Sequence, residues 1–185
     1  MQPTQSPQQL RGVFVPLVTP FHEGKIDLQS YRKLIEHYIG HRVSGIIPLG
    51  TTGEVPTLDD DEMDLVIEET LAIVANRVPV IVGAGGSATH KVERFLQKHE
   101  SQHFNGYLIV VPYYNRPSQE GIKLHYERLS DTTSKSILIY NIPYRTGVNL
   151  QNEVLFQLAE RKNVVGVKDC CANINQTLEL LAHRP

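Results

Sequence analysis

Short apolar runs alternate with longer segments of mixed polarity along almost the whole of this 185-residue chain. The runs lie at residues 13–18, 45–49, 79–83, 107–111, 136–140 and 164–168. The segments between them have helical character and lie at residues 27–40, 58–76, 89–102, 119–130 and 151–161, with a last one from residue 174 to 185. Continuous apolar strands separated by helices are typical of βαβ units around a parallel sheet. The pattern therefore predicts an α/β protein with six βα units.

Lys168 ends the last of these runs, in the sequence Val-Val-Gly-Val-Lys-Asp. The four residues before it predict a short, fully buried strand that carries the lysine at its carboxyl end. Burial disfavours the charged form of a lysine and lowers its pKa, and a neutral lysine can attack a carbonyl carbon to form a Schiff base. The alternative is a structural lysine whose ammonium group reaches water along its aliphatic stem.

Two further segments favour a chemical role for Lys168. Residues 50–54, Gly-Thr-Thr-Gly-Glu, follow a predicted strand, and their hydroxyl and backbone N–H groups are suited to binding a carboxylate. Residues 140–147, Tyr-Asn-Ile-Pro-Tyr-Arg-Thr-Gly, follow another predicted strand. Tyr140 can carry a proton there, and Arg145 can hold a carboxylate through two hydrogen bonds. The alternatives are an ordinary βα turn, a packed tyrosine and an exposed arginine.

These segments, together with Pro-Tyr-Tyr-Asn-Arg-Pro at residues 112–117, resemble the dihydrodipicolinate synthase / N-acetylneuraminate lyase family of pyruvate-dependent enzymes. The resemblance runs from about residue 12 to the end of the sequence. Arg145 followed by Thr-Gly is similar to the dihydrodipicolinate synthase branch, in which this arginine receives the carboxylate of the second substrate. The resemblance implies a lyase that condenses pyruvate with aspartate semialdehyde in lysine and diaminopimelate biosynthesis, without a cofactor.

The resemblance also implies a role for each candidate residue. Lys168 would form an imine with the ketone of pyruvate, and loss of a methyl proton would give an enamine that adds to the aldehyde. Thr51 and Thr52 would bind the pyruvate carboxylate. Tyr140 would carry the proton beside the imine, and Thr52 would link it to Tyr114 in a hydroxyl relay.

An assembly is implied as well. In the family, the loop that corresponds to Tyr113 and Tyr114 crosses a tight dimer interface. Tyr113 is expected to be a packing contact there. We therefore expect a homo-oligomer, either a dimer or a dimer of dimers.

The family fold is a (β/α)₈ barrel, which has eight βα units and typically about 250 residues. Six units are present, so we expect a C-terminally truncated barrel over residues 12–185, preceded by a flexible leader at residues 1–11. The alternative architecture is a doubly wound sheet. Gly-Ala-Gly-Gly at residues 83–86 superficially resembles a dinucleotide loop, but it lacks the full glycine spacing and follows the third strand rather than the first.

Composition narrows the range of partners. A net charge of −2 argues against nucleic acid, and the sequence has no apolar run long enough to cross a membrane. Cys170 and Cys171 are adjacent and are the only cysteines, which is typical of a reducing cytoplasm. His37 and His41 have a spacing that zinc could use, but no third ligand is evident, so no metal site is expected.

Two other functions remain open from the sequence. One is a relative with the same chemistry that acts on 4-hydroxy-2-oxoglutarate or on a sugar acid. The other is an inactive fragment that serves as an assembly module, which the missing part of the barrel would favour. The retained site residues favour an enzyme.

Overall fold

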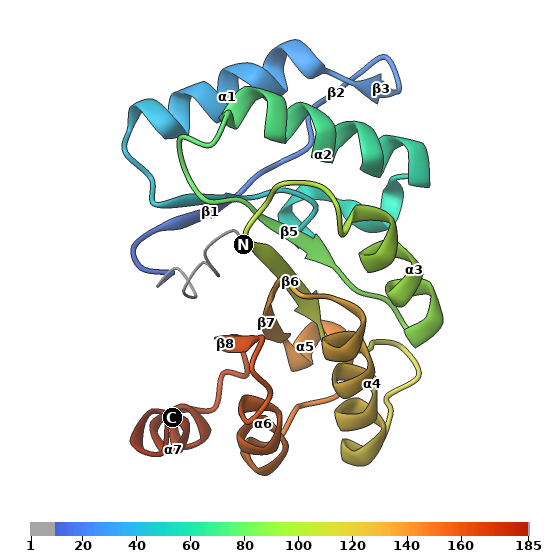
Figure 1. The fold of residues 1–185 in the computed structure, drawn as a ribbon, viewed down its shortest axis with the longest axis vertical. Helices are drawn as coiled ribbons and strands as arrows, with labels where there is room; N and C mark the ends of the chain where they lie inside the picture. The colour runs from blue at the N-terminus through green and yellow to red at the C-terminus, as the bar shows by residue number, and fades with distance from the viewer. Residues whose placement is uncertain (1–9, 185) are drawn as a thin grey trace, which may run out of the picture. The chain divides into compact units, whose positions relative to one another are not determined.

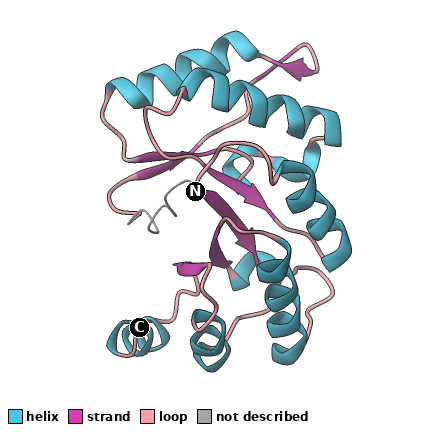
Figure 2. Ribbon diagram, in the orientation of Figure 1, coloured by secondary structure: helices cyan, strands magenta, loops and turns pink. Residues whose placement is uncertain are grey.

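The computed structural model describes residues 10–184, which form two compact units. The first unit contains the chain up to Gly83 and also residues 103–105, and the second contains residues 84–102 and the chain from Gly106 onward. Most of the predicted leader, residues 1–9, lies outside the described residues, and Leu10 and Arg11 have no regular structure. Figure 1 shows the order of the elements along the chain, and Figure 2 shows strands and helices alternating.

All six predicted strands and all six predicted helices are confirmed. The strands are β1 (Phe14–Pro16), β2 (Phe21–His22), β3 (Lys25–Ile26), β4 (Gly45–Ile47), β5 (Ile81–Ala84), β6 (Gly106–Val110), β7 (Ser136–Asn141) and β8 (Val164–Asp169). The helices are α1 (Leu28–Gly40), α2 (Asp60–Val74), α3 (Thr89–His99), α4 (Gln119–Thr132), α5 (Pro143–Thr146), α6 (Asn152–Ala159) and α7 (Ile174–Ala182), with 3₁₀ turns η1 (Thr51–Gly53) and η2 (Val55–Thr57). The sequence patterns did not predict β2, β3, α5 or the two 3₁₀ turns.

In the first unit, β1 and β4 pair in parallel, and Ile46 of β4 bridges in parallel to Val80 just before β5. Helices α1 and α2 pack against each other, and the buried Tyr31 hydroxyl lies 2.7 Å from Thr70 Oγ1. Helix α2 begins with a capping box, in which the side chains of Asp59 and Glu62 bond to each other's backbone N–H groups.

The hairpin of β2 and β3 is antiparallel and pairs Phe21 with Ile26 and His22 with Lys25. Glu23 and Gly24 between the strands both have positive φ, 50° and 74°. Two positive-φ residues make the kind of tight turn whose twist suits a two-residue hairpin. The strands are only two residues long, too short for a periodic pattern to reveal them.

In the second unit, β6, β7 and β8 pair in parallel in the order of the chain. Tyr107 pairs with Ile137, and Tyr140 pairs with Lys168. Side chains of β6 and β7 such as Ile109 and Ile139 are buried, as is Leu129 of α4, a helix that packs against α3 and α6. In the second unit these three strands lie side by side in the order of the chain, without the reversal of strand order that defines a doubly wound sheet.

The prediction that residues 164–168 are fully buried is wrong. The strand forms, but Val165 is 40% exposed, Gly166 is exposed and Lys168 is half-buried. Among the described residues β8 pairs with β7 alone, so its other edge is uncovered. The pairing also shifts between Ile137 and Leu138, which skips Val165 and leaves it outside the regular register.

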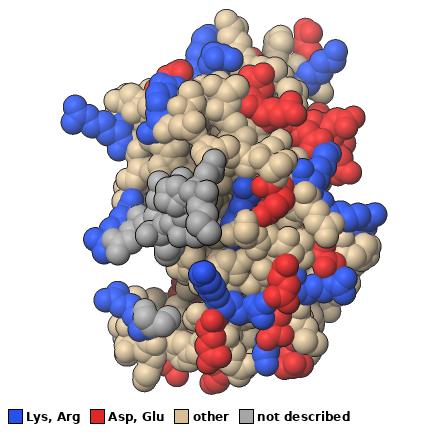
Figure 3. All heavy atoms as spheres, in the orientation of Figure 1, with Lys and Arg blue, Asp and Glu red and all other residues tan. Residues whose placement is uncertain are grey.

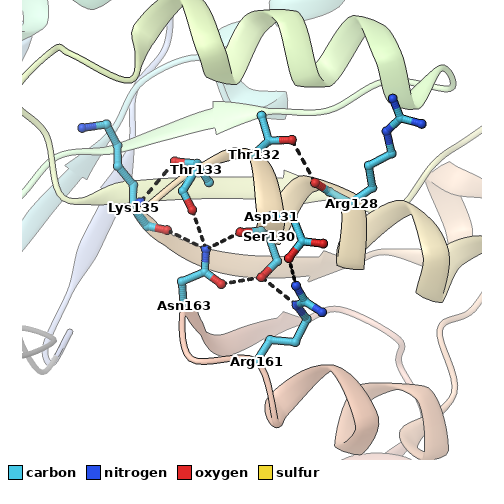
Figure 4. Close-up of polar contacts among 8 residues, drawn as sticks. All are labelled: Arg128, Ser130, Asp131, Thr132, Thr133, Lys135, Arg161 and Asn163. Carbon is cyan, nitrogen blue, oxygen red and sulfur yellow. Dashed lines mark hydrogen bonds and ion pairs between the residues drawn. The ribbon is translucent and has the colours of Figure 1, made fainter.

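Asn163 ties the start of β8 to the turn between α4 and β7 (Figure 4). Its Nδ2 donates to the carbonyl oxygens of Ser130 at 3.0 Å and Thr133 at 2.8 Å, and its Oδ1 accepts from Ser130 Oγ at 2.5 Å. Arg161 donates to Ser130 Oγ at 2.9 Å and pairs with Asp131. These bonds lie at the amino end of β8, opposite the end that carries Lys168, and so they support the strand rather than the site.

Candidate functional site

Lys168 and Tyr140 lie side by side at the carboxyl ends of β8 and β7. They are register partners, and the Lys168 Nζ lies 4.2 Å from the centroid of the Tyr140 ring. Tyr140 is 6% exposed, so its buried ring provides an apolar surface beside the amine. Parallel strands end at the same edge of a sheet, and this explains why two residues 28 positions apart in the sequence meet. The structure thus brings together the predicted nucleophile and the predicted proton carrier.

The segment after β7 forms the short helix α5, which ends at Gly147 with φ of 76°. Arg145 is exposed, donates through Nε to the Tyr144 hydroxyl at 3.1 Å and stacks over the Tyr144 ring at 5.1 Å. Its guanidinium is therefore held at the surface of the same strand end by a neighbouring side chain. Thr146, in contrast, is buried and bonds to the backbone of the turn, which makes it a structural residue.

Tyr113 and Tyr114 follow β6 and are exposed to 37% and 87%. Tyr114 has φ of 70° and Arg116 has φ of 51°, a conformation that is uncommon for residues other than glycine. The loop is anchored to α5, because Tyr114 N donates to Thr146 O at 3.4 Å and Arg116 Nε donates to Gly147 O at 2.6 Å. It therefore presents two aromatic rings to solvent on a defined backbone. Within the described chain, neither ring is buried.

Thr51 and Thr52 form the first two positions of η1 in the first unit, and both are exposed. The first N–H groups of a helical turn have no acceptor within the turn, so the two exposed threonines offer amides as well as hydroxyl groups to a ligand. Gly83 of β5 makes room for this turn, because a side-chain carbon there would lie 2.1 Å from Leu49 O. Leu49 has φ of 56°, so the turn begins from an uncommon backbone conformation, as often happens at binding sites.

Cys170 and Cys171 are both half-buried and free. Cys171 bonds to the carboxylate of Asp169, which accepts from its N–H at 3.0 Å and from its thiol at 3.4 Å. Partial burial alone would raise the pKa of Asp169, but hydrogen bonds from Thr177 and from Cys171 outweigh it and lower that pKa. Asp169 is therefore an anion that organises the segment after Lys168.

Asn141 lies beside the candidate site and has a structural role. It follows Tyr140 and is completely buried, and its side chain bonds to Asn149 and Leu150. An asparagine at the end of an apolar strand is a signal that could have suggested such a network, because a buried amide must find partners.

Among residues 10–184, no three His, Cys, Asp or Glu side chains come together as metal ligands would. The His37 and His41 rings lie 4.2 Å apart, and His41 Nδ1 lies 2.7 Å from His37 O, which is a contact at the carboxyl end of α1. No described helix has the length and apolar character needed to cross a membrane. On the face drawn in Figure 3, basic and acidic side chains are interspersed.

Comparison with known proteins shows which family has this sequence and fold. The model of the dihydrodipicolinate synthetase family matches residues 9–184. The chain is 48% identical over 177 residues to 4-hydroxy-tetrahydrodipicolinate synthase 2 of Clostridium acetobutylicum, covering 96% of this chain and 62% of that protein. The solved structure of the 4-hydroxy-tetrahydrodipicolinate synthase from Methylacidiphilum fumariolicum SolV matches with a TM-score of 0.93 at 37% identity, covering 96% of this chain and 59% of that one. Dihydrodipicolinate synthase from Thermotoga maritima matches with a TM-score of 0.89 at 42% identity, covering 94% of this chain and 61% of that one.

Fold and site together define a parallel α/β protein with a lysine and a tyrosine at neighbouring strand ends. The chain belongs to the dihydrodipicolinate synthetase family. It spans about three fifths of the length of the relatives that it matches. The predicted fold class, a (β/α)₈-type barrel of which six βα units are present, is confirmed by the match to the solved members.

Proposed function

We propose that this chain carries the pyruvate chemistry of a 4-hydroxy-tetrahydrodipicolinate synthase, a lyase that condenses pyruvate with aspartate semialdehyde through a Schiff base on Lys168. The observation that carries the proposal is the placement of Lys168 Nζ 4.2 Å from the Tyr140 ring at the carboxyl ends of two paired strands. An amine that attacks a ketone needs a neighbouring group to accept and return protons, and a phenol can do so.

The proposed reaction begins when the neutral amine of Lys168 adds to the ketone carbon of pyruvate. Proton transfers through Tyr140 allow the carbinolamine oxygen to leave as water, which gives a protonated imine. A methyl proton then passes to Tyr140, and the iminium nitrogen accepts the electrons to give an enamine. The enamine carbon bonds to the aldehyde carbon of the second substrate, whose oxygen takes up a proton, and addition of water or an amine to the re-formed imine releases Lys168. The chemistry needs neither a metal nor an organic cofactor, because the iminium nitrogen is the electron acceptor.

Thr51 and Thr52 would bind a carboxylate. They present hydroxyl groups and the first amides of a helical turn, a combination suited to an anion. By resemblance to the family, we propose that they bind the carboxylate of pyruvate and that Thr52 acts in a proton relay with Tyr140 and Tyr114.

Arg145 would bind the carboxylate of aspartate semialdehyde. Its present partner is the Tyr144 hydroxyl, a neutral group that a carboxylate can replace with a stronger, charge-assisted bond. Tyr113 would pack against a second copy of the chain in a dimer or a dimer of dimers, since an aromatic ring 37% exposed on an anchored loop is a typical interface residue. Small polar substrates and a free thiol pair suit the cytoplasm.

The test is a condensation assay with pyruvate and a set of aldehydes. We expect pyruvate consumption with aspartate semialdehyde and much less with the sugar-acid aldehydes, and no cleavage of 4-hydroxy-2-oxoglutarate. Cleavage of 4-hydroxy-2-oxoglutarate in preference to condensation would favour the related aldolase. Absence of any pyruvate reaction in folded protein would favour the assembly module.

A further inference from the structure

A chain of hydrogen bonds runs from the residue after Tyr140 to the residue after Lys168. It starts at Asn141, passes through the loop before α6, crosses to the first turns of α7, and returns to Asp169. Asn141 and Asp169 are themselves register partners in β7 and β8, and Cys170 N donates to Asn141 O at 2.8 Å. The bonds therefore form a closed ring around the two strand ends that carry the site.

The first part of the ring is centred on the buried amide of Asn141. Its Oδ1 accepts from Leu150 N at 3.1 Å, and its Nδ2 donates to Asn149 Oδ1 at 2.9 Å and to Leu150 O at 3.3 Å. Every polar atom of this side chain is bonded, as a fully buried amide requires. The loop at Asn149 and Leu150 is thereby fixed to the end of the strand that carries Tyr140.

Gln176 of α7 forms the second part. Its Nε2 donates to Leu150 O at 2.8 Å, and its Oε1 accepts from Asn149 Nδ2 at 2.8 Å. The donor and the acceptor of the Gln176 side-chain amide thus both bond to the loop at Asn149 and Leu150. Asn152 strengthens the link by donating to Gln176 O at 2.9 Å.

Thr177 completes the ring. Its hydroxyl lies 2.6 Å from Asp169 Oδ2 and 3.2 Å from Asn173 O, and the bond to the charged carboxylate is the shorter one. Asp169 follows Lys168 directly. The hydrogen bond from Thr177 to Asp169 therefore links α7 to the residue next to the lysine.

Apolar packing contributes little to the placement of α7. None of its residues is fully buried, and Ile174, Leu178 and Leu181 are exposed to 67%, 57% and 53%. A helix without a buried face depends on its polar contacts for a defined position. The bonds of Gln176, Thr177 and Glu179 are therefore the main polar contacts that place α7 within the second unit.

We propose that Asn141, Gln176 and Thr177 are positioning residues that hold Lys168 against Tyr140 in the geometry that imine formation needs. The proposal rests on the proposed function. Catalytic groups must be kept within about 0.5 Å of a productive arrangement, and at this edge strand the pairing with β7 holds the backbone of Lys168 from one side only, so a second constraint is needed. The ring supplies that constraint from outside the substrate-binding surface.

The experiment measures the rate at which pyruvate becomes trapped on Lys168 by borohydride, as a function of pyruvate concentration. Gln176→Ala is compared with Asn175→Ala, which removes an amide from the exposed neighbouring position of α7. We expect Gln176→Ala to lower the limiting trapping rate about tenfold with little change in the half-saturating pyruvate concentration. Asn175→Ala should stay within about twofold of the wild type.

A second pair of variants tests the hydroxyl group of Thr177, with Thr177→Val as its nearly isosteric replacement. Thr177→Val removes the hydroxyl and should lower the limiting rate by a similar factor, whereas Thr177→Ser keeps the hydroxyl and should restore it. Limiting rates of Gln176→Ala and Thr177→Val within twofold of a reactive wild type would overturn the positioning role. Failure of the wild type itself to trap pyruvate would instead overturn the proposed function, and the positioning role with it.

Discussion

Replacing Asn163 with Asp tests how strongly the amino end of β8 is held. The change is nearly isosteric, but it replaces the Nδ2 donor by a second oxygen that faces the carbonyl groups of Ser130 and Thr133, at the 3.0 and 2.8 Å where the amide now donates. Losing two hydrogen bonds costs about 2 kcal/mol, and leaving two carbonyl groups facing a carboxylate adds to that cost. We expect a loss of unfolding free energy of about 3 kcal/mol.

The assay is thermal and urea unfolding of Asn163→Asp beside the wild type. For a chain of this size each kcal/mol lowers the melting temperature by about 2–4 °C, so we expect a decrease of about 6–12 °C. Lys162→Ala, at the exposed neighbouring position, should stay within about 0.5 kcal/mol of the wild type. A melting temperature of Asn163→Asp within 2 °C of the wild type would refute the claim that this network holds β8.

Three further predictions concern acid, the Thr51–Gly53 turn and the second substrate. Burial lowers the pKa of His125 from 6.5 to about 4, so the unfolded chain binds more protons than the folded chain between these pH values. The free energy of unfolding should therefore fall by up to about 3 kcal/mol as the pH drops from 6.5 to 4. In His125→Gln, unfolding measured over the same pH range should show a smaller fall. Gly83→Ala forces a methyl group to within 2.1 Å of Leu49 O and should lower the free energy of unfolding by about 2–4 kcal/mol. Gly40→Ala adds its methyl group in open space on α1 and should not destabilise the protein. Equal stability of the two variants would contradict the close packing of Gly83 against Leu49. Arg145→Ala should raise the KM for aspartate semialdehyde at least tenfold and leave pyruvate trapping unchanged, and an unchanged KM would remove Arg145 from the site.

Much of this fold follows from local sequence pattern. The six apolar runs specify strands because each is short, continuous and bounded by polar segments, and Lys168 meets Tyr140 because parallel strands end at one edge. The hairpin at Phe21–Ile26 escaped prediction because two-residue strands have no measurable period. The burial of β8 was overestimated because an apolar run shows only that a strand can be buried. It does not show whether another element covers that strand.

The candidate site was predictable in its residue types but not in its supporting contacts. Tyr140, Arg145 and Lys168 are recognisable because their chemistry is distinctive at strand ends. Asn141 and Gln176 are ordinary amides in the sequence, and only the three-dimensional arrangement shows that both bond to the same loop. The bond from Gln176 to Leu150 joins residues 26 positions apart, which the periodicity of a single segment cannot reveal.

The most direct test of the account is to incubate the chain with pyruvate and borohydride and to measure the masses of its peptides, with Lys168→Arg as the control. The account predicts one reduced pyruvate adduct, on the peptide that contains Lys168, and none in the control. An adduct on a different lysine, or none in protein shown to be folded, would contradict it.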